Sequence, residues 1–194
     1  ILGGRKSTDQ ADALGRVLLL ETDAQALLAV LDALTEIANL EAGDAVLRFI
    51  EKRQSYLLER AKDDHLDHSD WVTITPPLAR ACELVGLLKP KRGAQVIARR
   101  ILEGVLLSKL SVVYDRQNQN PLPAGQALAR AACSALSRLA DPMALYSLRL
   151  MDKAAGSARG VPIRNLRRPV SIVSGWPQDP QIAGEVRAAI QALS

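Results

Sequence analysis

The sequence predicts an all-α protein assembled from stacked helical hairpins, and three observations support this class. Of the 194 residues, 48% are hydrophobic but only 3% are aromatic, and Ala and Leu dominate the apolar set. These residues favour helices, whereas strands are enriched in β-branched and aromatic residues. Apolar residues recur at helical spacing through most of the chain. One helix pattern also recurs along the chain, as repeat architectures require.

Capping residues, prolines and glycines divide the chain into successive helices. Residues 1–7 are expected to fray, and Thr22 or Asp23 is expected to cap the second helix. Glu41–Asp44 is expected to end the helical pattern of the second helix before the third helix begins. Pro76–Pro77 is expected in the first turn of the fourth helix, where proline is tolerated. The expected helices cover about 9–20, 24–39, 44–60, 75–88, 94–108, 125–140, 142–155 and 181–193.

Self-comparison shows an internal repeat among these helices. Val30–Ile37, Ala81–Leu88 and Ala132–Leu139 align at successive steps of 51 residues, and Ala189–Leu193 follows after a further 57. One hairpin cannot bury its apolar face alone, but stacked neighbours bury it together. The sequence therefore predicts a single α-solenoid domain, 1–194, of about four hairpins. The expected hairpins are 9–39, 43–88, 93–140 and 141–193.

The two cysteines follow the same repeat. Cys82 and Cys133 share a column with Leu31 and Ile190, which predicts that both are buried core residues. Free buried thiols are typical of a reducing compartment, so a cytoplasmic location is expected. No apolar run approaches the roughly 18 residues that span a bilayer, so no membrane insertion is expected. Because the chain lacks an initiator Met, we expect it to be part of a longer polypeptide.

The repeated helices resemble a known family. Asp179–Leu193 contains an Asp-Pro turn, then Val-Arg, small residues and a closing Ala-Leu, which resembles the second helix of HEAT repeats. Arg130–Leu136 is similar to the same pattern, and Asp23–Ile37 is similar more loosely. Leu28 and Ala79 depart from it, since the family pattern has Arg in that column. The resemblance implies a right-handed solenoid whose second helices line a concave face.

The resemblance also implies a function, namely a non-catalytic protein–protein interaction scaffold without a cofactor. The partner is expected to be another protein or another domain of the same polypeptide. The chain has only two histidines and no glycine-rich phosphate loop, so His-dependent acyl transfer and nucleotide binding have little support. Two alternatives remain open: a nucleic-acid-binding HEAT-like module, and an accessory or lyase-type enzyme for which no catalytic residue is identified.

The segment Asp63–Asp70 is the one candidate metal site. His65, Asp67 and His68 are ligand types that Zn or Mn accepts. A solvated acidic loop between helices explains the same residues. The solvated loop is favoured, because the cluster is local and has no distant partner.

Basic and aromatic residues are the candidate partner contacts. The formal net charge of +4 and pI near 9.3 are compatible with an anionic partner. The stretch Gly156–Gln181 contains an arginine loop that could bind phosphate or an acidic segment, or simply remain hydrated. A repeat column of arginines could form a positive stripe, or cover apolar neighbours. The candidates are Arg159, Arg164, Arg167 and Arg168 in the loop, Arg48, Arg99 and Arg149 in the column, and the loop aromatics Tyr114 and Trp176.

Overall fold

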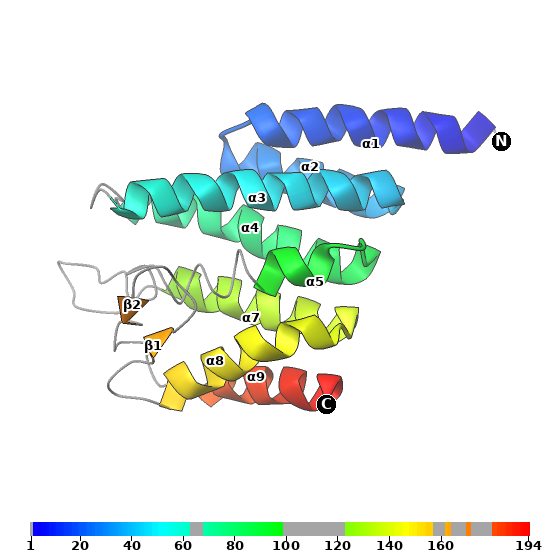
Figure 1. Ribbon diagram of the computed structural model, residues 1–194. Coiled ribbons are helices and arrows are strands. Elements are labelled where there is room, and N and C mark those ends of the chain that lie inside the picture. The colour runs from blue at the N-terminus through cyan, green and yellow to red at the C-terminus, as the bar shows by residue number, and fades with distance from the viewer. Residues whose placement is uncertain (1, 63–67, 99–122, 157–161, 164–169, 172–179) are drawn as a thin grey trace.

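The computed structural model describes residues 2–62, 68–98, 123–156, 162–163, 170–171 and 180–194 (Figure 1). Side chains are described for 8–53, 73–98, 127–149, 152 and 183–194. The described residues are helical apart from turns and one short strand pair, which confirms the all-α class. The helices are α1 (Leu2–Leu20), α2 (Ala24–Ile37), α3 (Leu40–Lys62), α4 (His68–Leu88), α5 (Gly93–Val96), α7 (Pro123–Leu139), α8 (Leu145–Gly156) and α9 (Pro180–Leu193), with a 3-10 turn at Pro142–Ala144. Strands β1 (Pro162–Ile163) and β2 (Val170–Ser171) pair antiparallel.

The helices lie in two rows (Figure 1). In one row α4 packs between α2 and α7, and α7 in turn contacts α9. In the other row α3 packs between α1 and α5, and α8 contacts α9 across the rows. The two termini lie at opposite ends of this stack. In the part of the chain that the structure describes, no helix combines the length and apolar character needed to cross a bilayer.

The turns that end α2, α4 and α7 share one backbone geometry. Ala38, Lys89 and Ala140 have positive φ values of 47°, 50° and 53° and follow one another at steps of 51 residues. Their backbone N–H groups donate to the carbonyls four residues earlier, at 3.1, 2.9 and 3.1 Å. This left-handed residue satisfies a carbonyl that the helix end leaves without a partner. The same left-handed backbone conformation therefore recurs every 51 residues, which is the period of the sequence repeat.

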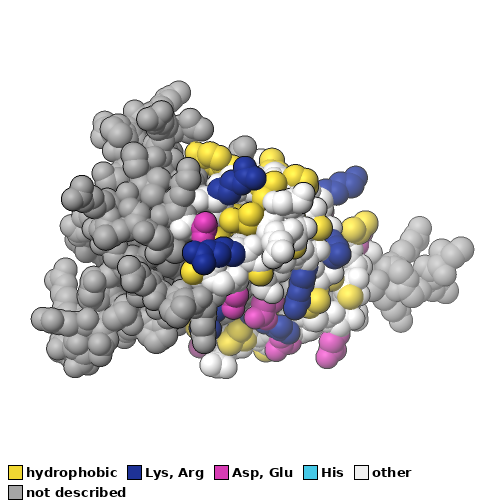
Figure 2. Space-filling model, turned by 90° about the horizontal axis from the view of Figure 1, so that it is seen from below, with side chains coloured by type: hydrophobic (Ala, Val, Ile, Leu, Met, Phe, Trp, Pro, Cys, Tyr) yellow, Lys and Arg dark blue, Asp and Glu magenta, His cyan; other side chains and the backbone are white. Residues whose placement is uncertain are grey.

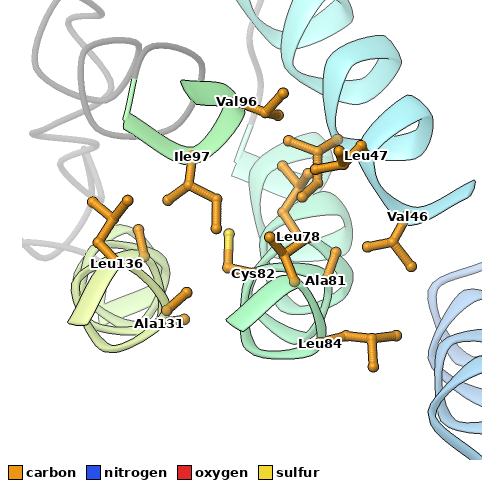
Figure 3. Packing of buried hydrophobic residues seen from close by; sticks show 14 of the residues in the cluster. Val46, Leu47, Leu78, Ala81, Cys82, Leu84, Val96, Ile97, Ala131 and Leu136 are labelled. Carbon is orange, nitrogen blue, oxygen red and sulfur yellow. The ribbon is translucent and has the colours of Figure 1, made fainter. Parts of the chain in front are cut away.

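The apolar core lies between the two rows. Phe49 of α3, Leu31 and Leu34 of α2, and Leu78 of α4 are among its largest fully buried side chains. Leu31, Cys82 and Cys133, which share one repeat column, are all buried, whereas Ile190 is partly buried against the same core. Figure 3 shows Cys82 pointing from α4 toward Ile97, with Leu136 of α7 nearby. The predicted core position of both cysteines is confirmed.

Two glycines let neighbouring helices approach closely. A Cβ at Gly15 of α1 would lie 2.8 Å from Cβ of Ala45 in α3. A Cβ at Gly86 of α4 would lie 2.9 Å from Cα of Ala135 in α7. Real Cβ atoms do not approach other atoms so closely, so the spacing of these helix pairs requires glycine.

Local hydrogen bonds define the turn between α1 and α2. The Glu21 carboxylate accepts hydrogen bonds from the backbone N–H groups of Thr22 and Asp23 at 2.7 and 2.8 Å, and these bonds lower its pKa. Asp23 then caps α2 through the N–H of Ala26 at 2.8 Å, which confirms the predicted cap. Arg53 of α3 donates to the Glu21 carbonyl and stacks 5.8 Å from the Phe49 ring centroid. The turn is thereby attached to α3.

Several predicted helix starts were wrong. Helix α1 begins at Leu2 rather than near Asp9, because a capping-type residue permits a helix to start but does not stop one that began earlier in the chain. Helix α3 begins at Leu40 and continues through the expected break at Glu41–Asp44. The side chain of Asn39 caps it by accepting the N–H of Ala42 at 2.8 Å.

The fourth helix differs most from its prediction. It begins at His68 and contains Pro76 and Pro77 in its interior, where each lacks the N–H that a helical hydrogen bond needs. Trp71, which precedes the expected start of this helix at residue 75, therefore lies within α4. The predicted fifth helix, 94–108, is described only as far as Ala98, and its remainder lies outside the described residues.

Candidate binding groove

Two of the predicted partner-binding residues have described side chains. Arg48 lies exposed on α3 and Arg149 lies exposed on α8, both in or beside the row of α1, α3 and α5. The other candidates lie outside the described residues: Arg99, Tyr114, Arg159, Arg164, Arg167, Arg168 and Trp176. The arginine loop and the stripe therefore stay predictions.

The candidate metal site stays a prediction for the same reason. His65 and Asp67 lie outside the described residues, and His68 begins α4 without a described side chain. Within the side chains that the structure does describe, no three His, Cys, Asp or Glu residues gather in a group that could hold a metal ion.

A hollow on the described surface crosses the other row. It has a volume of about 890 Å³ and is lined by α4, α7 and α9. Its walls combine charged side chains with small or apolar ones. They are Arg80, Glu83 and Leu87 of α4, Ala127, Arg130, Ala131, Ser134, Ser137 and Arg138 of α7, and Glu185 and Ala188 of α9. We call this hollow the inner groove.

The repeat brings these side chains together. Arg80, Ala131 and Ala188 occupy one column at steps of 51 and 57 residues, and Glu83 and Ser134 occupy another. Because the columns align across neighbouring helices, equivalent outward positions form a continuous surface. The prediction placed the binding face on these second helices but did not identify these residues. The same alignment could have identified them, because it places these residues in columns on the opposite side of the helices from the core columns.

An apolar hollow adjoins the inner groove. It has a volume of about 670 Å³ and shares Leu87 with the inner groove. Leu84, Leu88 and Leu40 also line it, together with Thr35, Ala38, Asn39 and Glu41. Leu40 is 71% exposed and Leu87 is 51% exposed, so both offer apolar surface to solvent at this hollow. The two hollows therefore form one surface with an apolar end and a polar centre.

Charge is distributed unevenly across the inner groove. Arg80 pairs with Asp32 of α2 at 2.8 Å and with Glu83 at 3.0 Å, and the Glu83 and Asp32 carboxylates raise its pKa. Helix α7 carries Arg130 and Arg138 but no acidic residue. The charge of Arg80 on the α4 wall is therefore compensated by neighbouring carboxylates, and the charged residues that α7 contributes to the lining are both arginines.

One carboxylate in the inner groove lacks a hydrogen-bond donor. Glu185 lies on the α9 wall, and its Oε2 is buried without a partner in the described structure. Across the same helix, Arg187 pairs with Asp152 of α8 at 3.1 Å and ties α9 to the second row. A buried carboxylate oxygen without a donor favours a bound group that can supply an N–H.

The described lining of the inner groove combines charged, hydroxyl and methyl groups. It offers guanidinium groups, carboxylates, two serine hydroxyls and methyl groups, but neither an imidazole nor a thiol. Cys82 and Cys133 are buried in the core, and burial raises the pKa of both thiols, that of Cys133 to about 12. These two thiols are therefore poor nucleophiles in the folded protein.

The described surface at the C-terminal end of the stack carries both basic and acidic side chains. Figure 2 views this end, and its described surface alternates basic, acidic and hydrophobic side chains. Comparison of the chain with protein-family models, with curated proteins and with solved structures finds no match. The groove geometry therefore carries the functional argument alone.

Proposed function

We propose that the chain is a right-handed α-solenoid of HEAT-like hairpins that acts as a non-catalytic protein-binding scaffold. The division into hairpins at 9–39, 43–88, 93–140 and 141–193 is part of this proposal. The observation that carries it is the inner groove, where outward columns of three second helices line one continuous hollow. Repeat arrays use such extended surfaces for binding, because each added repeat extends the surface.

The exposed leucines support protein as the class of partner. Leu40 and Leu87 lie beside the polar groove, so an apolar anchor and charged contacts are available on one face. Protein interfaces combine apolar anchors with a polar surround in this way. The groove also contains acidic Glu83 and Glu185, which a phosphate backbone would oppose.

Site-specific crosslinking tests the proposal. A photoreactive residue at exposed Ser134 should capture a partner from an extract of the native source, whereas the same residue at Arg48 should not. Ala188→Trp should abolish capture by filling the groove without changing its charge. Capture from both positions with equal yield, or capture that survives Ala188→Trp, would refute the inner groove as the interface.

A further inference from the structure

We propose that the interface between α2 and α4 is a hinge, at which the hairpin of α1 and α2 rocks against the rest of the stack. The apolar hollow lies at this interface and is lined by the C-terminal ends of both helices. The neighbouring interface, between α4 and α7, is closed at the equivalent place by Gly86. Such a hinge follows from helix packing alone, whether or not the inner groove binds a partner.

The sequence repeat relates the two interfaces residue by residue. Gly86 of α4 faces Ala135 of α7, and a Cβ on Gly86 would lie 2.9 Å from the Ala135 Cα. One step of 51 residues earlier, the same two columns contain Thr35 of α2 and Leu84 of α4. The distance between packed helices depends on the side chains at their contact, and threonine with leucine needs more room than glycine with alanine. This difference explains why the apolar hollow lies between α2 and α4.

The apolar hollow extends to the core. Leu84 lines it although its side chain is fully buried, and Figure 3 shows Leu84 pointing away from α7. Thr35 also lines it, and its hydroxyl donates to the Leu31 carbonyl of its own helix at 2.9 Å. Side chains that border a hollow lack packing partners on that side, so they hold two helices together less firmly than a filled contact does.

The other row of helices supplies the pivot. Gly15 of α1 lies against Ala45 of α3, where an added Cβ would be 2.8 Å from the Ala45 Cβ. Arg53 of α3 donates to the Glu21 carbonyl in the turn that follows α1. One edge of the hairpin is therefore fixed to α3 while its other edge borders the apolar hollow, and this asymmetry allows rotation about the fixed edge.

An exposed ion pair limits how far the hinge opens. Arg80 of α4 lies 2.8 Å from Asp32 of α2, and it also pairs with Glu83 of its own helix at 3.0 Å. The side chain of Asp32 is 64% exposed, and exposed ion pairs contribute little free energy, so this pair restrains the interface without locking it. When α2 moves away, Arg80 keeps Glu83 as a partner and Asp32 is hydrated.

Distance measurements between spin labels on the full chain test the hinge. Glu36, Leu87 and Arg138 share one repeat column and are all exposed, so E36C/L87C and L87C/R138C place matched label pairs across the two interfaces. The native thiols are buried and stay unlabelled in the folded protein. We expect the distance distribution of the 36/87 pair to be roughly twofold wider than that of the 87/138 pair. Equal widths would overturn the proposal.

Two variants connect the hinge to its cause. T35G/L84A gives the α2–α4 interface the residues of the closed interface and should narrow the 36/87 distribution to the width of the 87/138 distribution. Circular dichroism establishes whether this variant folds, and T35G alone repeats the test with a milder change and should narrow the distribution in part. An unchanged 36/87 width in a folded variant would contradict the proposal.

The ion pair gives a test that leaves the core untouched. D32N removes the charge that α2 offers to Arg80, so it should widen the 36/87 distribution and leave the 87/138 distribution as it is. Equal widening of both distributions would show a general loss of packing and contradict a hinge at the α2–α4 interface.

Discussion

At the residue scale, the same unusual backbone conformation ends three helices without glycine. Ala38, Lys89 and Ala140 have positive φ, a region in which a Cβ costs roughly 1–2 kcal/mol. Glycine adopts this conformation without that cost and is the usual residue at helix C-termini. The repeated turn therefore carries strain that each substitution to glycine would relieve.

We expect Ala38→Gly and Ala140→Gly each to raise the free energy of unfolding by about 0.5–1 kcal/mol, after the entropy cost of glycine is subtracted. Ala29→Gly is the control, because Ala29 is exposed within α2 and should lose about 1 kcal/mol. Urea denaturation measures all three. A loss of stability in the turn variants equal to that of Ala29→Gly would contradict the assigned backbone conformation.

The two buried thiols also make the stability of the protein depend on pH. Burial raises the pKa of Cys82 above the ordinary value of 9.0, and burial together with the nearby Glu185 carboxylate raises that of Cys133 to about 12. Their neutral forms therefore contribute stability that is fully present below pH 9.0. That contribution is lost as the pH rises toward the folded values, because only the unfolded thiols ionise easily.

We expect both thiols to resist a thiol-specific disulfide reagent at about pH 8 and to react fully after unfolding in urea. Between about pH 9 and 11, stability should fall more steeply in the parent than in C82A/C133A, since only the parent carries these groups. The comparison uses the slope of stability against pH rather than stability itself, because each alanine also leaves a small cavity that lowers stability at every pH. Rapid reaction of either thiol with the folded protein would show that it is accessible.

At the element scale, helix spacing depends on small residues at a few contacts. Gly86 of α4 meets the backbone of Ala135 in α7, and Gly15 of α1 meets Ala45 of α3. Gly184 of α9 provides a contrast, since a Cβ there would meet no atom of the described residues within 4 Å. The same substitution should therefore have opposite effects in two helices.

We expect Gly86→Ala to destabilise the protein by about 1–2 kcal/mol, because overpacking against α7 exceeds the roughly 1 kcal/mol gained in helix propensity. Gly184→Ala should stabilise by up to about 1 kcal/mol, since only the propensity term applies. Thermal and urea denaturation of both variants provide the measurement. Stabilisation by Gly86→Ala would mean that α4 and α7 are further apart than described.

At the scale of the whole molecule, the described helices make their main contacts with near neighbours in the stack. Helix α4 packs against α2, α3 and α7, whereas α1 packs against α2 and α3 and α9 packs against α7 and α8. In such an array, stability is a sum of local terms and neighbour interfaces. The middle should therefore open less readily than the ends.

Hydrogen exchange followed by mass spectrometry measures this difference along the chain. We expect amides of α4 and of the second half of α7 to exchange most slowly. Leu18→Ala removes a buried side chain of α1 and should accelerate exchange in α1 and α2 far more than in α9. Equal acceleration across all helices would indicate one cooperative unit rather than a neighbour-coupled array.

The candidate site was predictable only in part. The repeat alignment assigned Leu31, Cys82 and Cys133 to the core and pointed to the second helices as a binding surface. It did not identify Arg130, Arg138 and Glu185, because a column shows that a residue faces outward but not what lies opposite it. Only packing of α4 against α7 and of α7 against α9 brings these groups into one groove.

The sequence by itself determined the helical class, a cap at Thr22 or Asp23 and the 51-residue period, since composition, capping and periodicity act within one or two helical turns. The start of α3 at Leu40 is also local, since the Asn39 side chain caps it, but this cap was not predicted. Tertiary structure decided that α4 continues through the break signal at Pro76–Pro77. It also decided the close approach at Gly86 and the shape of the inner groove. These depend on distances between residues far apart in the chain, which only the folded packing determines.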